Sequence, residues 1–411
     1  MGVIEEFRSV HRDEGVLKAG KWAGRNVLLS FYHPAAYRFV DAISPLVLDR
    51  KEMEQRFQTN RSIEYYDRKR KIEIDLPAGE DHVETIGKRV GTYTISQPFV
   101  GVLQDANLFG AYPIPVDDNN NIVMEAIVSP EVLTLNIMSS AREFVSNPLE
   151  GRTEGDSGSI GSAVLLYNRW NDGYYHWTVE TLNRLEGVEK YTDRTGHQPK
   201  LIVGPDPNRF QLETLELLGY EEDDLIKWDQ RTKSVDRLVV PSMRREYNLG
   251  TVSPVAVQWL RDRMRTAVAD RELDITENLS KRIYISREDA PRRQVVNEDE
   301  ITDILENRGF EKYVLSENSV AENIQLFAQA DLIVAPHGAG LTDLIYATDT
   351  TVIELFRSND VRPTYYVLSE HLNHRYRCLL CEYEGPDLVV DPDELKSIVD
   401  MELSMKGSPV S

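Results

Sequence analysis

The spacing of hydrophobic residues changes character at Ala163. Between Gly91 and Leu133, short apolar runs are separated by turn-forming segments such as Asp117-Asp-Asn-Asn-Asn121, a pattern typical of antiparallel strands. From Ala163 onward, short apolar runs alternate with segments whose apolar residues recur every three or four positions. Because strands that alternate with helices pair in parallel, the chain predicts an α/β protein with an N-terminal β-containing extension.

The elements of the alternating region follow from this spacing. Strands are expected at 163–167, 200–203, 225–228, 237–240, 282–286, 312–315, 332–335 and 351–356. Helices are expected at 176–185, 208–218, 254–271, 301–305, 319–330 and 392–405, with Asp391 as a cap and capping boxes at 297–300 and 319–322. Upstream, 92–95, 99–103 and 122–128 are β-like, whereas 8–21 and 49–70 are compatible with helices.

The pattern divides the chain into four parts. Residues 1–90 form an N-terminal extension of unclear structure, 91–272 a first domain, 273–390 a Rossmann-like second domain and 391–411 a closing helix. The polar stretch 270–280 marks the boundary between the two domains. Residues 150–162 are rich in Gly and Ser and predict a loop. The Gly-Asp-Ser-Gly within this loop matches the sequence around a trypsin-like nucleophile, but the α/β alternation that follows argues against the β-barrel of such a protease.

Composition narrows the classes of partner. The 411 residues carry a formal net charge of −21, which argues against general nucleic-acid binding and leaves at most peripheral membrane contact. No apolar run reaches the ~18 residues of a membrane span, and the charged start does not resemble a secretory signal, so we expect a cytoplasmic location. The basic residues are 33 Arg and 14 Lys; a large acidic excess with few lysines is typical of adaptation to high salt, and an ordinary acidic protein is the alternative.

The two cysteines, Cys378 and Cys381, exclude a disulfide framework. Together with His371 and His374 they supply four side chains of the type that binds zinc. However, residues 375–382 predict a strand, which would point the two cysteines to opposite faces, and zinc modules usually separate their ligand pairs by a longer loop. Ordinary packing is therefore the favoured interpretation, and no metal site is predicted.

The first candidate site is the turn after the predicted strand 332–335. Gly338 and Gly340 permit a tight turn that a side chain would obstruct, and the exposed amides of the following helix would attract phosphate. His337 stands at the carboxyl end of the strand, where open α/β sheets place their ligands. A phosphorylated or nucleotide-linked ligand is expected; a histidine that only caps the turn is the alternative.

The second candidate site lies just after the first parallel strand. His176 and Glu180 are four residues apart, so they share a helix face that Arg184 extends. A carboxylate that orients an imidazole makes it a plausible general base. The alternative is a packing histidine beside a surface ion pair.

Two further features could carry chemistry. Arg287, Arg292 and Arg293 form a cationic cluster at the end of a strand, and guanidinium groups suit phosphate, although balancing the nearby acidic residues is the alternative. Glu354 lies inside an apolar strand, where a carboxylate needs a partner. Sugar hydroxyls would serve, and an arginine ion pair is the alternative.

Together these pieces resemble glycosyltransferase family 61, a group that includes capsular polysaccharide biosynthesis proteins. The matching pieces are Tyr174–Trp177 with Glu180 and Arg184, Tyr284–Arg287, Asn297–Glu298 with Gly309–Phe310, Phe327–Asp331, His337–Thr342 and Val352–Glu354. Their order and spacing match over roughly 163–356. Asp343 departs from the family pattern, which often has Asn there.

The resemblance implies a GT-B fold, with two Rossmann-like domains facing a cleft, and an inverting, metal-independent sugar transfer that needs no cofactor. The donor would be a nucleotide sugar and the acceptor a glycan or lipid-linked glycan. His176 or Glu180 would be the base. The donor would contact Ser286, Arg287, His337, Gly338, Ala339, Gly340, Leu341, Thr342 and Glu354, with Asp172, Tyr175, Arg184, Arg292 and Arg293 as further candidates.

Three other classes compete with this interpretation. An α/β-hydrolase would need a Gly-x-Ser-x-Gly elbow after the His-Gly-Ala-Gly turn, and none follows. A Rossmann oxidoreductase would need Gly-x-Gly-x-x-Gly after an early strand, and that spacing does not occur. A non-catalytic nucleotide-sugar-binding protein of the same fold would lack a usable base, so His176 and Glu180 favour an enzyme.

Overall fold

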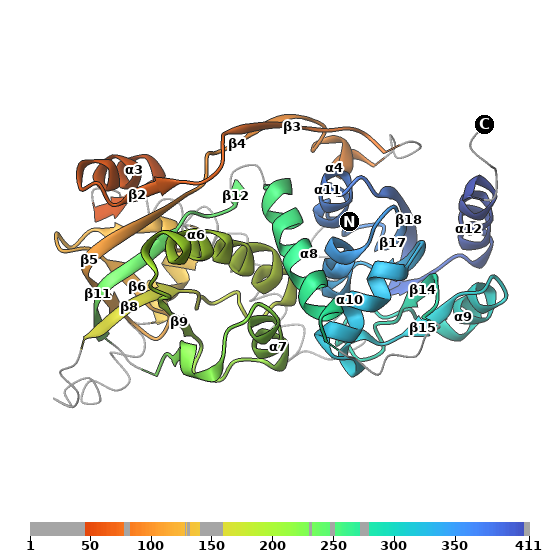
Figure 1. Ribbon diagram of the computed structural model, residues 1–411. Coiled ribbons are helices and arrows are strands. Elements are labelled where there is room, and N and C mark those ends of the chain that lie inside the picture. The colour runs from red at the N-terminus through yellow and green to blue at the C-terminus, as the bar shows by residue number, and fades with distance from the viewer. Residues whose placement is uncertain are drawn as a thin grey trace, which may run out of the picture. The chain divides into compact units, whose positions relative to one another are not determined.

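The computed structural model describes residues 46–77, 83–127, 129, 132–139, 159–229, 232–246, 251–271 and 279–406 (Figure 1). These residues form two compact units. We call the described residues within 46–71 and 94–260 the N-terminal unit, and those within 72–93 and 261–406 the C-terminal unit. The expected helix at 8–21 and the Gly-Asp-Ser-Gly of the expected loop lie outside the described residues.

The N-terminal unit is built on one mixed sheet. Its parallel strands are β11 (Thr232–Pro241), β8 (Ile160–Leu165), β9 (Lys200–Val203) and β10 (Leu225–Lys227), in that order. On the other side of β11, the long strand β5 (Phe99–Phe109) pairs with it antiparallel. The antiparallel region and the first parallel region that the sequence separates are therefore parts of a single sheet, because β5 and β11 share a ladder.

Beyond β5 this sheet continues through short strands. These are β6 (Ile114–Val116), β7 (Ile122–Val123), β1 (Val47–Leu48) and, off this path, β2 (Ile63–Tyr65). They pair antiparallel except for the parallel pair of β1 with β7. The expected strand at 122–128 is wrong beyond Val123, because the chain then turns into the 3₁₀ helix η2 (Met124–Ala126). This turn places Glu125, an acidic residue, in the interior.

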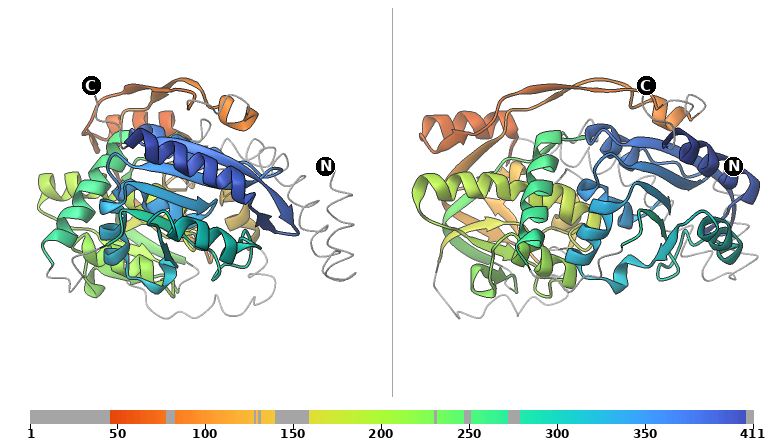
Figure 2. Two further views of the ribbon diagram at one scale, coloured as in Figure 1. Left: turned by 90° about the vertical axis from the view of Figure 1, so that its right-hand side faces the viewer. Right: turned by 45° about the vertical axis from the view of Figure 1, so that its right-hand side comes forward.

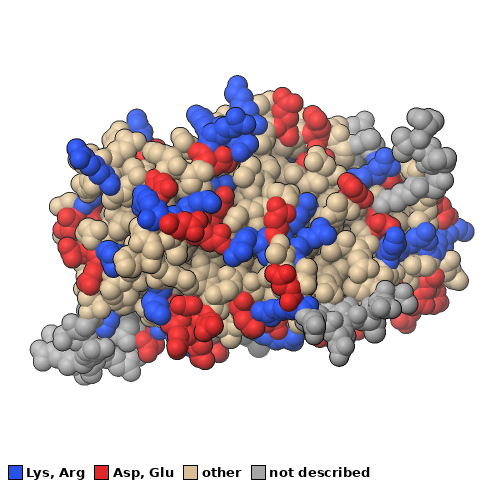
Figure 3. Space-filling model, in the orientation of Figure 1, with Lys and Arg blue, Asp and Glu red and all other residues tan. Residues whose placement is uncertain are grey.

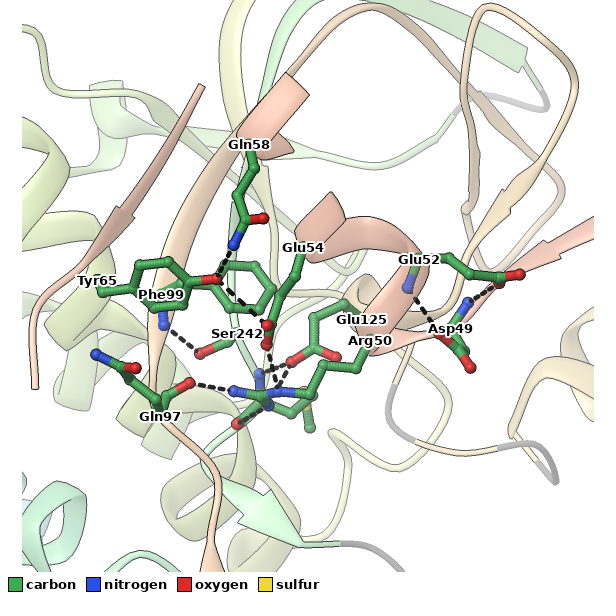
Figure 4. Close-up of polar contacts among 11 residues, drawn as sticks. Asp49, Arg50, Glu52, Glu54, Gln58, Tyr65, Gln97, Phe99, Glu125 and Ser242 are labelled. Atoms are coloured by element: carbon green, nitrogen blue, oxygen red, sulfur yellow. Dashed lines mark hydrogen bonds and ion pairs between the residues drawn. The ribbon is translucent and has the colours of Figure 1, made fainter. Parts of the chain in front are cut away.

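Helix α3 (Arg50–Thr59) starts at a capping box. The Asp49 carboxylate accepts a hydrogen bond from the Glu52 amide at 2.9 Å, and Glu52 accepts one from the Asp49 amide at 3.0 Å (Figure 4). These bonds satisfy amides that no helix carbonyl reaches. The expected helix at 49–70 is correct only for its first part, since β2 begins at Ile63.

One arginine fastens α3 to the N-terminal sheet (Figure 4). The guanidinium of Arg50 lies 2.9 Å from the buried carboxylate of Glu125 and donates to the backbone carbonyls of Gln97, at 2.6 Å, and Met243, at 3.3 Å. Charge-assisted bonds of this kind are stronger than neutral ones. Arg50 therefore gives the buried Glu125 its counter-charge and joins three segments that are distant in sequence.

The helix after β8 is not the regular α-helix that the spacing suggests. Residues His176–Thr181 form the π-helix η4, Leu182–Arg184 form the 3₁₀ helix η5, and only then does α6 (Leu185–Thr195) begin. A π-turn adds a residue to each turn and so changes which side chains share a face. The remaining helices of this region, α7 (Arg209–Leu217) and α8 (Pro254–Ala269), match their expected positions, and α8 continues into the C-terminal unit.

The C-terminal unit has a second, mainly parallel sheet. Its order is β15 (Glu311–Tyr313), β14 (Arg282–Ile285), β16 (Leu332–Pro336), β17 (Thr351–Arg357), β18 (Arg375–Glu384) and β19 (Asp387–Val389). Only the β18–β19 pair is antiparallel. The predicted α/β character is thus confirmed, with two sheets that are rich in parallel strands. Apolar strands such as β16 and β17 are buried almost throughout, as expected of parallel strands inside a sheet.

Helices α9 (Glu298–Glu306), α10 (Val320–Gln329), α11 (Thr364–His371) and α12 (Pro392–Lys406) accompany this sheet, and α11 is one that the sequence did not predict. Leu395 and Val399 of α12 belong to the hydrophobic core of this unit. Figure 2 shows this helix, in dark blue, alongside the blue strands of the sheet.

The two predicted capping boxes have different outcomes. The one at Ser319 forms, since its side chain accepts from Glu322 and Glu322 accepts from the Ser319 amide. Asn297 makes no cap bond and instead bonds the backbone of Val390 in both directions, at 2.9 and 3.1 Å. At Asn297 the side chain therefore bonds a residue that is distant in sequence instead of capping its own helix.

The chain also forms a two-stranded ribbon, β3 (Arg70–Ile74) with β4 (Gly91–Ile95), and a short helix α4 (Glu84–Gly87). In the C-terminal unit, the hydroxyl of Tyr366 bonds the carbonyl of Asp75, which ties this ribbon to α11. Among the described residues no helix is long and apolar enough to cross a membrane. On the face shown in Figure 3, acidic and basic side chains are interspersed.

Cys378 and Cys381 both lie on the predicted strand, β18, and both are buried. Cys381 packs in the core beside α12, whereas His374 bonds the carbonyl of Leu344 at 3.0 Å. Within the described residues no group of three or more His, Cys, Asp and Glu side chains could hold a metal. The structure thus places these side chains in packing and backbone contacts.

Candidate functional site

The N-terminal unit holds a histidine backed by a buried carboxylate. His176 is the first residue of the π-helix η4, and its Nδ1 lies 2.9 Å from Oε2 of Glu180, which is fully buried. The other carboxylate oxygen of Glu180 pairs with Arg245, from β12 (Arg245–Glu246). Because a carboxylate only accepts, Nδ1 carries the proton and Nε2 of the neutral ring is left as the acceptor.

The surroundings of His176 keep its ring neutral. Trp170 lies against the imidazole with ring centroids 4.9 Å apart, and Tyr175 meets it edge-on at 5.7 Å. Burial, and secondly the guanidinium of Arg245, lower the pKa of His176 to about 4. The side chain still keeps 35 % of its surface exposed, so a substrate hydroxyl can reach it. A neutral, oriented and accessible imidazole has the properties of a general base.

Arg184 does not extend the face of His176 and Glu180, and that expectation is wrong. Its guanidinium turns inward and donates to the carbonyls of Leu165, at 3.0 Å, and Pro241, at 3.4 Å, and burial lowers the pKa of Arg184 to about 10. The π-turn between the two positions is the physical reason for the change of face. Arg184 thus braces η5 against the sheet.

The C-terminal unit holds a second histidine and glutamate pair. His337 follows β16, and its Nδ1 lies 2.5 Å from Oε1 of Glu354 on β17, whose Oε2 accepts from the hydroxyl of Tyr376 on β18 at 2.6 Å. Phe356 stacks on the imidazole at 5.1 Å between ring centroids, and Tyr365 lies 5.4 Å away. Three neighbouring parallel strands therefore assemble this group: His337 follows the carboxyl end of β16, where such sheets place ligands, Glu354 lies in the middle of β17 and Tyr376 near the start of β18.

Glu354 has no exposed surface, and both of its oxygens are bonded inside the protein. The structure therefore does not support direct contact between Glu354 and sugar hydroxyls, nor the arginine pair considered as the alternative. Its place makes it the residue that orients His337.

The two glycines of the His337 turn are needed for space. Gly338 has an extended backbone, with φ −176° and ψ 169°, which any residue can adopt. A Cβ at Gly338 would lie 1.9 Å from Nη1 of Arg287, and one at Gly340 would lie 2.9 Å from Cδ1 of Leu315. This crowding confirms the expectation that a side chain would be obstructed at these two positions, and Gly338 lets the guanidinium of Arg287 lie against the backbone. The segment that follows, η9 (Ala339–Tyr346), is a 3₁₀ helix.

The arginine cluster separates into different environments. Arg293 pairs with Asp360 at 3.1 Å, and the carbonyl of Arg292 accepts from Arg287 at 3.3 Å. Within the described residues, the guanidinium of Arg287 makes no ion pair, and its Nε is buried without a hydrogen-bond partner. Burial, and secondly Arg293, lower the pKa of Arg287. Arg287 is thus a cation with donors available for an anion.

The other predicted contacts lie nearby or are engaged elsewhere. Ser286 donates to Glu298 at 2.8 Å and accepts from the amide of Glu288, so its hydroxyl belongs to a network within the unit. The hydroxyls of Thr342 and Tyr365 lie 3.4 Å apart, beside His337. Ala339 and Leu341 belong to η9, next to Gly338, and Asp343 is buried in the same segment. In the N-terminal unit, Asp172 is exposed and accepts from Asn208 at 3.5 Å.

Sequence reasoning missed Arg245 and Tyr376. Arg245 pairs with a glutamate 65 positions earlier in the chain, and Tyr376 bonds one 22 positions earlier. No local spacing signals either contact, since the tertiary structure brings these segments together; only Glu354 and Tyr376 lie on paired strands.

A family model described as Glycosyltransferase 61 matches residues 174–353, a stretch that includes His176, Glu180 and His337 and ends one residue before Glu354. No curated protein matches the chain.

Proposed function

We propose that this chain, a glycosyltransferase because residues 174–353 form a glycosyltransferase family 61 domain, transfers a sugar from a nucleotide-sugar donor. The acceptor is a hydroxyl of a glycan or lipid-linked glycan. The transfer inverts the anomeric carbon and needs no metal. The two units act as the two halves of a GT-B enzyme, and the protein works in the cytoplasm of a salt-adapted cell with at most peripheral membrane contact.

In this proposal His176 is the general base. Its Nε2 takes the proton of the acceptor hydroxyl while that oxygen forms a bond to the anomeric carbon, and the bond from that carbon to the donor phosphate breaks. Glu180 holds the imidazole in the required tautomer, and Arg245 supplies the positive charge that this buried carboxylate needs. The nucleoside diphosphate leaves with the electron pair.

Arg287, His337 and the amides around Gly338 hold the diphosphate. The support for this role is the guanidinium of Arg287, which lies against Gly338 with a buried, unpartnered Nε. A guanidinium that has no carboxylate partner matches the paired oxygens of a diphosphate. Charge placed there stabilises the leaving group as it develops negative charge.

The observation that carries the proposal is the neutral, partly exposed His176 backed by Glu180. The test is to find a bound nucleotide sugar by calorimetry in molar KCl, then to measure transfer to glycan acceptors with wild type, His176→Gln and Arg287→Ala. We expect His176→Gln to bind the donor normally but to lose about 10²- to 10⁴-fold in transfer rate. Arg287→Ala should instead lose donor affinity. Donor binding without transfer by wild type on any acceptor would favour a non-catalytic binding protein, and normal transfer by His176→Gln would remove the base.

A further inference from the structure

The two histidine and glutamate pairs differ in how the carboxylate is compensated. Glu180 has two partners, His176 on one oxygen and the cation Arg245 on the other. Glu354 also uses both oxygens, but its second partner is the neutral hydroxyl of Tyr376. Among the described residues, no lysine or arginine lies within ion-pair distance of Glu354.

Burial makes this difference matter. Glu354 has no exposed surface and lies on β17 between apolar neighbours that are also buried. An ionised carboxylate in such a place is stable only with an opposite charge beside it. The one side chain in contact that can supply this charge is His337, through its 2.5 Å bond from Nδ1.

The other groups around His337 come from β17 itself, from α11 and from the segment after β14. Phe356 of β17 stacks on the ring, and Tyr365 of α11 lies beside it. Arg287 lies against the adjacent Gly338. None of these three is an anion, so Glu354 is the carboxylate that faces His337 and opposes the charge of Arg287.

We propose that His337 works as an imidazolium, with Glu354 and Tyr376 as positioning residues, and that its Nε2–H donates a hydrogen bond to the leaving diphosphate of the donor. This inference rests on the proposed function and deepens it. The proton stays on His337 during transfer. The two chemically similar pairs thus have opposite tasks, a neutral acceptor at His176 and a charged donor at His337.

The contrast follows from the counter-charges. Where Arg245 already neutralises Glu180, a proton on His176 is superfluous, in line with a pKa of about 4 for that imidazole. Where Glu354 has no such cation, its histidine must be the cation. When two similar titratable groups lie in environments that favour opposite protonation states, the neutral group can accept a proton and the protonated group can donate a hydrogen bond.

The first test reads the charge directly. Full-length protein with ¹⁵N-labelled histidine is studied by NMR at pH 7, and the His337 and His176 signals, among those of 8 histidines, are assigned with His337→Gln and His176→Gln. We expect both ring nitrogens of His337 to carry protons, and only one of His176. Glu354→Gln should convert His337 to a neutral ring. A neutral His337 in the wild type would overturn the proposal.

The second test uses inorganic pyrophosphate as the probe and calorimetry as the readout. Because an uncharged imidazole forms a weaker bond to an anion, Glu354→Gln should bind pyrophosphate about 10- to 100-fold more weakly, and Tyr376→Phe should show a smaller loss in the same direction. Glu402→Gln is the matched control, since Glu402 is an equally buried carboxylate of the same unit that pairs with Arg375 and Arg377. Equal affinities in the Glu354→Gln and wild-type proteins would contradict the inference.

Neither readout depends on sugar transfer. If His337 is charged and the protein binds pyrophosphate but has no transferase activity, this inference is supported and the proposed function is refuted. A neutral His337 in a protein that transfers sugar would do the reverse.

Discussion

Replacing Gly338 with Ala adds one methyl group at the point where Arg287 meets the backbone. The new Cβ would lie 1.9 Å from Nη1 and 2.7 Å from Cζ of that guanidinium. Cβ atoms essentially never approach other atoms within 3.0 Å, so Nη1 must retreat by at least 1.1 Å, the difference between 3.0 and 1.9 Å. The side chain is long and flexible, and the backbone at 338 is extended, so the change displaces the arginine and leaves the fold intact.

The expected cost is in binding. A guanidinium moved by more than an ångström loses charge-assisted hydrogen bonds to the diphosphate, which contribute about 1.5–3 kcal/mol each. Loss of one such bond corresponds to roughly a 10- to 150-fold rise in Kd for the nucleotide sugar. The free energy of unfolding should change by less than about 1 kcal/mol, since Ala in an extended position also restricts the unfolded chain.

Calorimetric titration of the nucleotide sugar and thermal unfolding give the two readouts. Gly161→Ala serves as the neutral control, since its Cβ would meet nothing within 4 Å. Gly340→Ala is the opposite case, because its Cβ would crowd Leu315 at 2.9 Å and should lower stability by about 1–3 kcal/mol. Wild-type donor affinity in folded Gly338→Ala would refute the assignment of Arg287 to the diphosphate.

Three further predictions concern pH. The acid limb of kcat/KM for transfer should lie near pH 4, because the lowered pKa keeps His176 unprotonated above that value; a limb near 6.5 would argue against His176. In Arg245→Met this limb should move to higher pH, since the cation that opposes protonation is gone; an unmoved limb would mean that Arg245 does not act on His176. Burial lowers the pKa of His371 and of His374 to about 4, so the folded state binds fewer protons than the unfolded state between pH 6.5 and 4. The free energy of unfolding, measured in urea, should therefore fall as pH drops through this window, by about 3 kcal/mol from His374 alone, and a flat profile would contradict this.

The sequence predicted what depends on neighbours along the chain. The strands at 200–203 and 332–335 and the helix at 254–271 appear close to their expected ends, because each is set by local apolar spacing and by caps. The capping box at Ser319 also formed as predicted, since both of its bonds join residues three apart. His176 and Glu180 could be paired in advance for the same reason.

The tertiary structure decided everything that depends on which strands are neighbours. It joined β5 to β11 in one sheet, and it used Asn297 to hold Val390 where a helix cap was expected. It also chose the partners of the buried carboxylates: a cation for Glu180 and a tyrosine for Glu354. Local spacing can place an acidic residue beside a histidine, but the charge state of the pair is set by groups brought in from distant segments, because a buried charge responds to whatever lies within a few ångströms, whatever its position in the chain.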